Sequence, residues 1–196
     1  MRTLSEHFIQ DLVSEEGELH DIRQRVVIDP SLCMEVRCNY VNIYYRGSNL
    51  LRISERSPGN YFFFFDVKHV EDPADRSLLE KRIASLTGVH GWLSIVPELK
   101  HWVDLYLGKH PKEEREAQQL ILRANNFGRI SNATDFYILD IEYADRGARF
   151  DMIAAHWPSK SSSRKKSDKL RLAFSEVKYG DNALGGDAGI QKHIND

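Results

Sequence analysis

The spacing of apolar residues changes twice along this chain of 196 residues, and these changes constrain the fold more than any single motif does. Residues 36–68 form short strand-like runs that turn at Gly47-Ser48-Asn49 and at "ERSPGN", so we expect a β-meander there. Residues 72–128 follow a helical spacing instead. From residue 135 onward the strand pattern returns in three runs, "DFYILDIEYA", "RFDMIAAHW" and "LRLAFSEVKYG". Strands, then helices, then strands again predict a mixed α/β fold.

Three helices are expected in the middle part, and a short one before the first strands. The first of the three covers "EDPADRSLLEKRIASL", the second runs from near Pro97 to Gly108, and the third runs from Pro111 towards Gly128. The segment "MRTLSEHFIQDLVSEEG" has apolar residues at helical spacing and supplies the N-terminal helix. We expect residues 1–110 to form one domain of N-terminal helix, meander and helices, and residues 111–196 to form a second.

Composition limits the functions that such a chain can have. A hydrophobic content of 41% is enough to bury a core without disulfides, and the two cysteines have no accompanying Cys/His cluster for a structural zinc ion. The net charge of −2 means that any nucleic-acid contact must come from a local basic patch. The longest aromatic run, residues 61–65, is far too short to span a bilayer, so we expect a cytoplasmic protein with no membrane partner.

The last strand-like run, "LAFSEVKYG", places two opposite charges near the end of an apolar segment. Residues two apart in a strand point to the same side, so Glu176 and Lys178 should share a face with Phe174. Burying such a pair is costly and the pairing repays that cost poorly. A divalent cation would change this balance, because it gives the carboxylate a strong partner.

A second carboxylate is expected beside Glu176. Asp151 lies near the start of the preceding strand, and in an antiparallel hairpin with its loop at 158–169 the early part of one strand meets the late part of the other. Asp151, Glu176 and the carbonyl of Val177 would then hold Mg²⁺, or Mn²⁺ in its place. Lys178 would stand beside a water molecule and a phosphate, where it orients or helps deprotonate the water.

This pattern, "RFDMIA" followed by "LAFSEVKYG" after a helix and a strand, resembles the PD-(D/E)XK nuclease superfamily. The resemblance covers roughly residues 111–196. It implies a restriction-endonuclease-like core of a helix, a three-stranded meander and a helix, and it implies Mg²⁺-dependent hydrolysis of phosphodiester bonds. By the same resemblance Asp151 and Glu176 are metal ligands and Lys178 is the catalytic lysine.

The resemblance also implies a glutamate from the preceding helix. Glu116 is the preferred match, Glu113 and Glu114 are alternatives, and Glu142 is a further candidate because it sits across the tight "DRGA" turn from Asp151. Two departures stand out: Phe150 occupies the position of the family's proline, and the family core continues past its last helix into another strand, whereas this chain stops at Asp196. Either the helix is the last element that remains, or the sequence is a fragment of a longer protein.

Basic residues near this pattern are candidates for gripping phosphates. They lie in the polar loop and near the C-terminal end of the chain: Lys160, Arg164, Lys165, Lys166 and Lys192. The competing interpretation of the loop is a solvated hairpin tip. DNA is the expected substrate and RNA the alternative; the sequence predicts neither the oligomeric state nor the mode of cleavage.

Two other interpretations remain open. "FFDVK" supplies Asp66 and Lys68 in an apolar strand and is a rival acid-x-Lys pair, although it lacks an acidic partner in a preceding strand. Charges at the end of a strand also deter aggregation at an exposed sheet edge. The alternative to a nuclease is therefore a non-catalytic module that keeps the fold and binds nucleic acid or protein.

Overall fold

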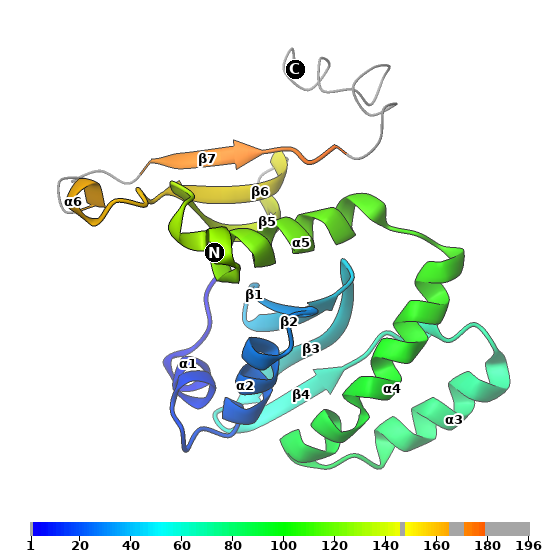
Figure 1. The fold of residues 1–196 in the computed structure, drawn as a ribbon. Helices are drawn as coiled ribbons and strands as arrows, with labels where there is room; N and C mark the ends of the chain where they lie inside the picture. The colour runs from blue at the N-terminus through cyan, green and yellow to red at the C-terminus, as the bar shows by residue number, and fades with distance from the viewer. Residues whose placement is uncertain (1, 146–147, 165–170, 179–196) are drawn as a thin grey trace. The chain divides into compact units, whose positions relative to one another are not determined.

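The computed structural model describes residues 2–145, 148–164 and 171–178, and the chain divides into two compact units, Met1–Lys112 and Glu113–Asp196. Within the described residues the fold is mixed α/β, with six α-helices and two antiparallel sheets of four and three strands (Figure 1). The fold class expected from the sequence is confirmed at this level. No helix in the described ranges is long and apolar enough to cross a membrane.

The first unit consists of a four-stranded meander and the helices before and after it. Its sheet has the strand order β1-β2-β3-β4. The elements in chain order are α1 (Glu6–Val13), α2 (His20–Ile28), β1 (Leu32–Val36), β2 (Tyr40–Tyr45), β3 (Ser48–Ser57), β4 (Asn60–Phe64), the 3-10 turn η1 (Val67–His69), α3 (Pro73–Ala84) and α4 (Gly88–Lys109).

Within the described residues, the second unit consists of α5, the short helix α6 and a three-stranded meander with the strand order β5-β6-β7. Both of its strand pairs are antiparallel, which confirms the expected hairpin between the last two strands. The elements in chain order are α5 (Glu113–Phe127), the 3-10 turn η2 (Arg129–Asn132), β5 (Phe136–Asp145), β6 (Ala148–His156), α6 (Ser161–Arg164) and β7 (Leu172–Ser175). The helix expected after the last strand lies outside the described residues.

The turn between β2 and β3 differs from the prediction at Gly47-Ser48-Asn49. Tyr45 pairs with Ser48, so the loop holds only Arg46 and Gly47, with φ angles of 49° and 69°. Two consecutive positive φ angles are the mark of a type I′ hairpin, whose twist matches that of the flanking strands. Because Arg46 adopts the left-handed conformation, two residues are enough for the turn, and Ser48 is already part of β3. The sequence signal placed the turn one residue too late, since arginine is not a usual residue at this position.

Three further elements of the first unit were not predicted correctly. Helix α2 and strand β1 were not predicted at all, and α4 begins at Gly88 instead of near Pro97. Proline inside a helix removes one backbone hydrogen bond and costs roughly 3 kcal/mol. Helix α4 tolerates Pro97 because Trp92, Ile95 and other apolar side chains on both sides of it are buried in the core.

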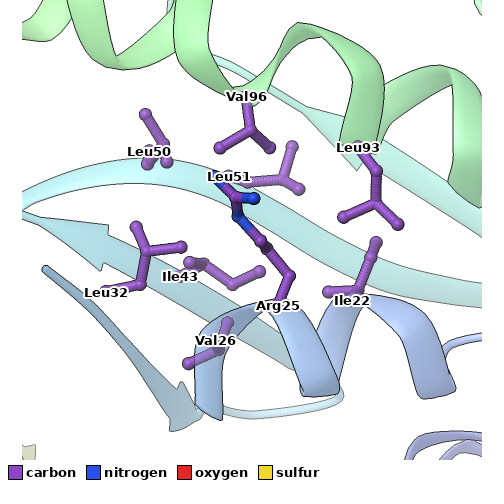
Figure 2. A pocket seen from close by; sticks show the side chains of 9 residues that line it. All are labelled: Ile22, Arg25, Val26, Leu32, Ile43, Leu50, Leu51, Leu93 and Val96. Carbon is purple, nitrogen blue, oxygen red and sulfur yellow. The ribbon is translucent and has the colours of Figure 1, made fainter. Parts of the chain in front are cut away.

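The core of the first unit lies between one face of the meander and the helices. Val41, Ile43 and Ile53 of the sheet pack with buried side chains of α1, α2 and α4. A small apolar cavity remains between α2, the sheet and α4 (Figure 2). Arg25 lines it, while its guanidinium reaches Asp29 at 3.4 Å. Among the described residues, all the other side chains that line this cavity are apolar, so Arg25 is its one polar lining group for an anionic substrate.

A shielded ion pair joins α4 to the end of α2. The ammonium of Lys100 donates to Asp29 and, at 2.7 Å, to the hydroxyl of Ser31. Burial alone would raise the pKa of Asp29, but hydrogen bonds from Lys100 and Ser31 outweigh it and lower the pKa to about 2. The folded state therefore holds this carboxylate ionised below its ordinary pKa of 3.8.

We expect Asp29→Asn to lower the free energy of unfolding at pH 7 by about 1–3 kcal/mol, because a buried ammonium loses its charged partner. Since the folded pKa is depressed, the stabilisation by Asp29 is present above pH 4 and is lost as the pH falls through about 2. Urea denaturation at pH 7, 4 and 2.5 measures this: the difference between the variant and the wild type should shrink at the lowest pH. Asp21→Asn, at the more exposed start of α2, is the matched control. A difference that stays constant with pH would contradict the assignment.

Candidate active site

Helix α5 is fastened along β5 by side chains near both of its ends. The amide of Asn126 donates to the carbonyl of Ile138 at 2.8 Å and accepts from its N–H at 3.0 Å. Near the other end, Nε of Arg115 contacts Oε1 of Glu142 at 2.7 Å. These contacts hold the acidic first turn of α5 against the strand that borders the candidate site.

The strand register puts two acidic positions at the same level, and a third follows the last paired residue of β7. Ile141 pairs with Met152 and Tyr143 with Phe150, which puts Glu142 at the level of Asp151 on the central strand β6. On the other side of β6, Met152 pairs with Ser175, and Glu176 is the next residue. The ladder itself ends at Ser175, one residue before the position expected to meet Asp151.

The end of the last strand was predicted incorrectly. Strand β7 stops at Ser175, and residues 176–178 follow it instead of continuing the ladder. The reason is that the N–H of Val177 donates to Oδ2 of the Asp151 side chain, at 2.7 Å. A hydrogen bond from a main-chain N–H to a carboxylate is stronger than one to a neutral carbonyl. Because Val177 is only 8% exposed, this contact is also shielded from water.

Glu176 and Lys178 remain on the same side of the chain although they are no longer in a strand. The ammonium of Lys178 lies 3.9 Å from Oε2 of Glu176, and the two side chains are 17% and 26% exposed. This distance is too long for a hydrogen bond, so the two groups attract each other through charge alone. Partial burial strengthens that attraction relative to an exposed pair.

Glu142 has an unusual backbone conformation. Its φ angle is 52°, in the left-handed region that residues other than glycine rarely occupy. A residue held in this region costs the fold about 1–3 kcal/mol. The Glu142 side chain pairs with Arg115. Arg115 was missed by the sequence analysis, which considered only the glutamates in the first turn of α5. The signal that would have found it is the single cation within "EEREAQ".

The other predicted acids lie at the start of α5. Glu113, Glu114 and Glu116 all lie in the first turn of α5, where the helix dipole favours acids. Of these, Glu116 is partly buried, while Glu113 and Glu114 are exposed.

The predicted phosphate-gripping residues are described only in part. Lys160 is exposed just before α6, and Arg164 is the last residue of that helix. Lys165, Lys166 and Lys192 lie outside the described residues.

The rival pair in the first unit has a structural role. Asp66 caps the 3-10 turn η1, and its Oδ1 accepts from the main-chain N–H of Lys68 at 3.1 Å. Its carboxylate thus holds a turn at the end of β4.

The donor set around Asp151 suits a hard cation. Within the described ranges, no group of three or more His, Cys, Asp or Glu side chains is arranged to hold a metal ion. Oδ2 of Asp151 accepts from Val177, so Oδ1 is the oxygen of that carboxylate left for a cation. The other two expected ligands, Glu176 and the Val177 carbonyl, also offer oxygen. Carboxylates supplemented by carbonyls and water are the ligands that Mg²⁺ prefers. In donor type alone, the expected ligands suit Mg²⁺.

No family model, curated protein or solved structure matches this chain. Any functional conclusion therefore depends on the geometry of the described residues.

We expect Asp151→Ala to increase the exchange rate of the Val177 amide hydrogen by about tenfold or more, because a charge-assisted hydrogen bond is lost. Asp151→Asn keeps an acceptor oxygen and should have a much smaller effect. Hydrogen exchange followed by NMR or mass spectrometry measures both. Asp135→Ala is the matched control, because that carboxylate accepts from the N–H of Ser159 in the same unit. Equal Val177 exchange in Asp151→Ala and the wild type would show that the contact does not form.

Proposed function

We propose that the chain is a metal-dependent nuclease that hydrolyses phosphodiester bonds of DNA, with RNA as the alternative substrate. Its second unit would then be a restriction-endonuclease-like core of the PD-(D/E)XK type. The observation that carries the proposal is the hydrogen bond from Val177 to Asp151, because it joins the segment that carries Glu176 and Lys178 to a second acidic residue. A partly buried acid, a second acid and a lysine at one place are the groups that phosphodiester hydrolysis needs.

In this proposal Asp151, Glu176 and the Val177 carbonyl hold Mg²⁺ or Mn²⁺. When bound, the ion would supply Lewis acidity and would lower the pKa of a water molecule. The hydrogen bond from Val177 fixes one oxygen of Asp151 and leaves the other for the ion. Arg115 neutralises Glu142 and so limits the repulsion among the neighbouring carboxylates.

Lys178 has a separate task from the ligands. Its ammonium is near Glu176 but not hydrogen-bonded to it, so it can reorient towards a phosphate oxygen or a water molecule. There it orients the attacking water and offsets the charge that develops on the phosphate. Glu116 or Glu142 assists from the side of α5 and β5.

A binding module without turnover is the competing function. One observation favours it: the described acids do not form a cluster of three that could hold an ion by side chains alone. Such a module would bind nucleic acid whether or not a divalent ion is present.

We expect cleavage of plasmid or single-stranded DNA with Mg²⁺ or Mn²⁺, and none with chelator. Lys178→Ala should lower the rate by about 100-fold or more, the usual contribution of a positioned acid–base group. Glu176→Gln should lower it similarly and should also raise the ion concentration needed. Gel electrophoresis of timed digests measures these rates.

Lys81→Ala removes an exposed lysine of α3 in the first unit and serves as the control, with the wild-type rate expected. Cleavage by Lys178→Ala at the wild-type rate would remove the role given to Lys178. DNA binding without cleavage under every ion condition would favour the binding module.

A further inference from the structure

One face of the first unit's sheet presents aromatic rings together with arginines. On β4, Phe62 and Phe64 point away from the core and are 40% and 39% exposed. Phe62 pairs with Ser54 of β3, and Phe64 pairs with Arg52, so all four residues share this face. The intervening residue, Phe63, packs against the core on the other face. Strand alternation therefore displays two large rings where a sheet face usually carries polar side chains.

Each ring has an arginine above it. The guanidinium of Arg56 lies 4.3 Å from the ring centre of Phe62. That of Arg52 lies between Tyr40 and Phe64, at 4.8 Å and 5.6 Å from their ring centres. A cation over a ring is favourable, and the guanidinium plane offers a further surface on which a flat group can stack.

These two arginines keep their positive charge uncompensated. Among the described residues neither Arg52 nor Arg56 has a carboxylate partner, and Nε of Arg52 has no hydrogen-bond acceptor. Other arginines of the same unit do pair with acids: Arg82 contacts Glu98 at 2.8 Å, and Arg46 contacts Asp104 at 2.9 Å. The face is thus complementary to an anion that also carries flat apolar groups.

Single-stranded nucleic acid combines phosphates with exposed bases, and its spacing fits. Residues two apart in a strand are separated by about 7 Å, twice the rise of about 3.4 Å per residue. Bases stacked in one strand of a duplex are about 3.4 Å apart. Phe62 and Phe64 are about twice as far apart, so they suit the wider spacing of unstacked bases in a single strand. A duplex hides its base faces and offers nothing for Phe62 and Phe64 to stack on.

We propose that Tyr40, Arg52, Arg56, Phe62 and Phe64 form a stacking platform for single-stranded nucleic acid. The inference deepens the proposed function, because it names the form of nucleic acid that the protein takes. Bases stack on the aromatic rings and on the guanidinium planes beside them, and the charges of the two arginines attract the phosphates. Binding tolerates changes of base sequence, since every base has a face that can stack.

Fluorescence anisotropy with a labelled oligothymidine and with a duplex of the same length tests the platform. All measurements contain chelator, so that no strand is cleaved and binding is read without activity. Phe62→Ala and Phe64→Ala should each raise the Kd for the single strand about fivefold or more. Phe62→Tyr should bind like the wild type, whereas Phe62→Leu should be weakened, because leucine is apolar but cannot stack.

The arginines are tested by salt dependence. For single strands, log K falls with log salt by about 0.7 for each phosphate contact. The double variant Arg52→Gln/Arg56→Gln should therefore lower the steepness of this dependence by about 1.4. Leu78→Ala and Lys81→Ala, exposed on α3, are the matched controls and should change neither the Kd nor the slope. Thermal melting of every variant checks that the first unit remains folded.

Each outcome separates this inference from the proposed function. Ring-dependent binding of the single strand supports the platform even if no cleavage is found, in which case only the nuclease proposal fails. Binding of the single strand that is unchanged in folded Phe62→Ala and Phe64→Ala overturns the platform, whatever the cleavage assays show. A duplex bound more tightly than the single strand, or equal binding by Phe62→Leu and Phe62→Tyr, also overturns it.

Discussion

The hydrogen bond from the main-chain N–H of Val177 to the side chain of Asp151 is the contact on which the candidate site depends. It forms two residues after the end of β7 at Ser175. Beyond Ser175 the main chain therefore bonds to the Asp151 side chain instead of to the backbone of β6. Glu176 and Lys178 are thereby placed on either side of a residue anchored to Asp151, both partly shielded from water. Without this contact the two charges would be ordinary residues at the end of a short edge strand.

Each unit uses a meander, but the two sheets serve different purposes in this account. In the first unit the helices bury one sheet face, and the shielded Lys100–Asp29 pair ties α4 to the end of α2. On the other face, at β3 and β4, Arg52 and Arg56 lie over Phe64 and Phe62, and neither has a carboxylate partner in the part of the chain that the structure describes. In the second unit the register of β5 and β6 aligns two acidic positions. Binding surface and reactive groups would thus come from two sheets of similar construction.

The sequence predicted the fold where local patterns and tertiary packing agree. The runs at β5 and β6 are rich in strand-forming residues and meet at the turn "DRGA", and α3 begins with an aspartate cap and a proline, so their positions were foreseen. The start of α4 was missed because Pro97 is a strong local stop signal, which packing overrides. The turn at Arg46 and Gly47 was misplaced because arginine gives no signal for a positive φ.

The candidate site shows the same limit. Asp151, Glu176 and Lys178 follow from a pattern of residue types along two strands. Arg115 does not, because its contact with Glu142 depends on how α5 lies along β5, which no local pattern encodes. The end of β7 was missed for a related reason: a side chain from β6 captures the amide that would have extended the strand.

Anomalous diffraction from a crystal soaked in Mn²⁺ tests the central claim most directly, because it locates the ion without reference to activity. We predict one strong peak for an ion bonded to carboxylate oxygens of Asp151 and Glu176 and to the carbonyl of Val177. We predict that this peak is lost in Asp151→Asn. A strong peak elsewhere, such as at Asp66, with none between residues 151 and 176, would contradict it.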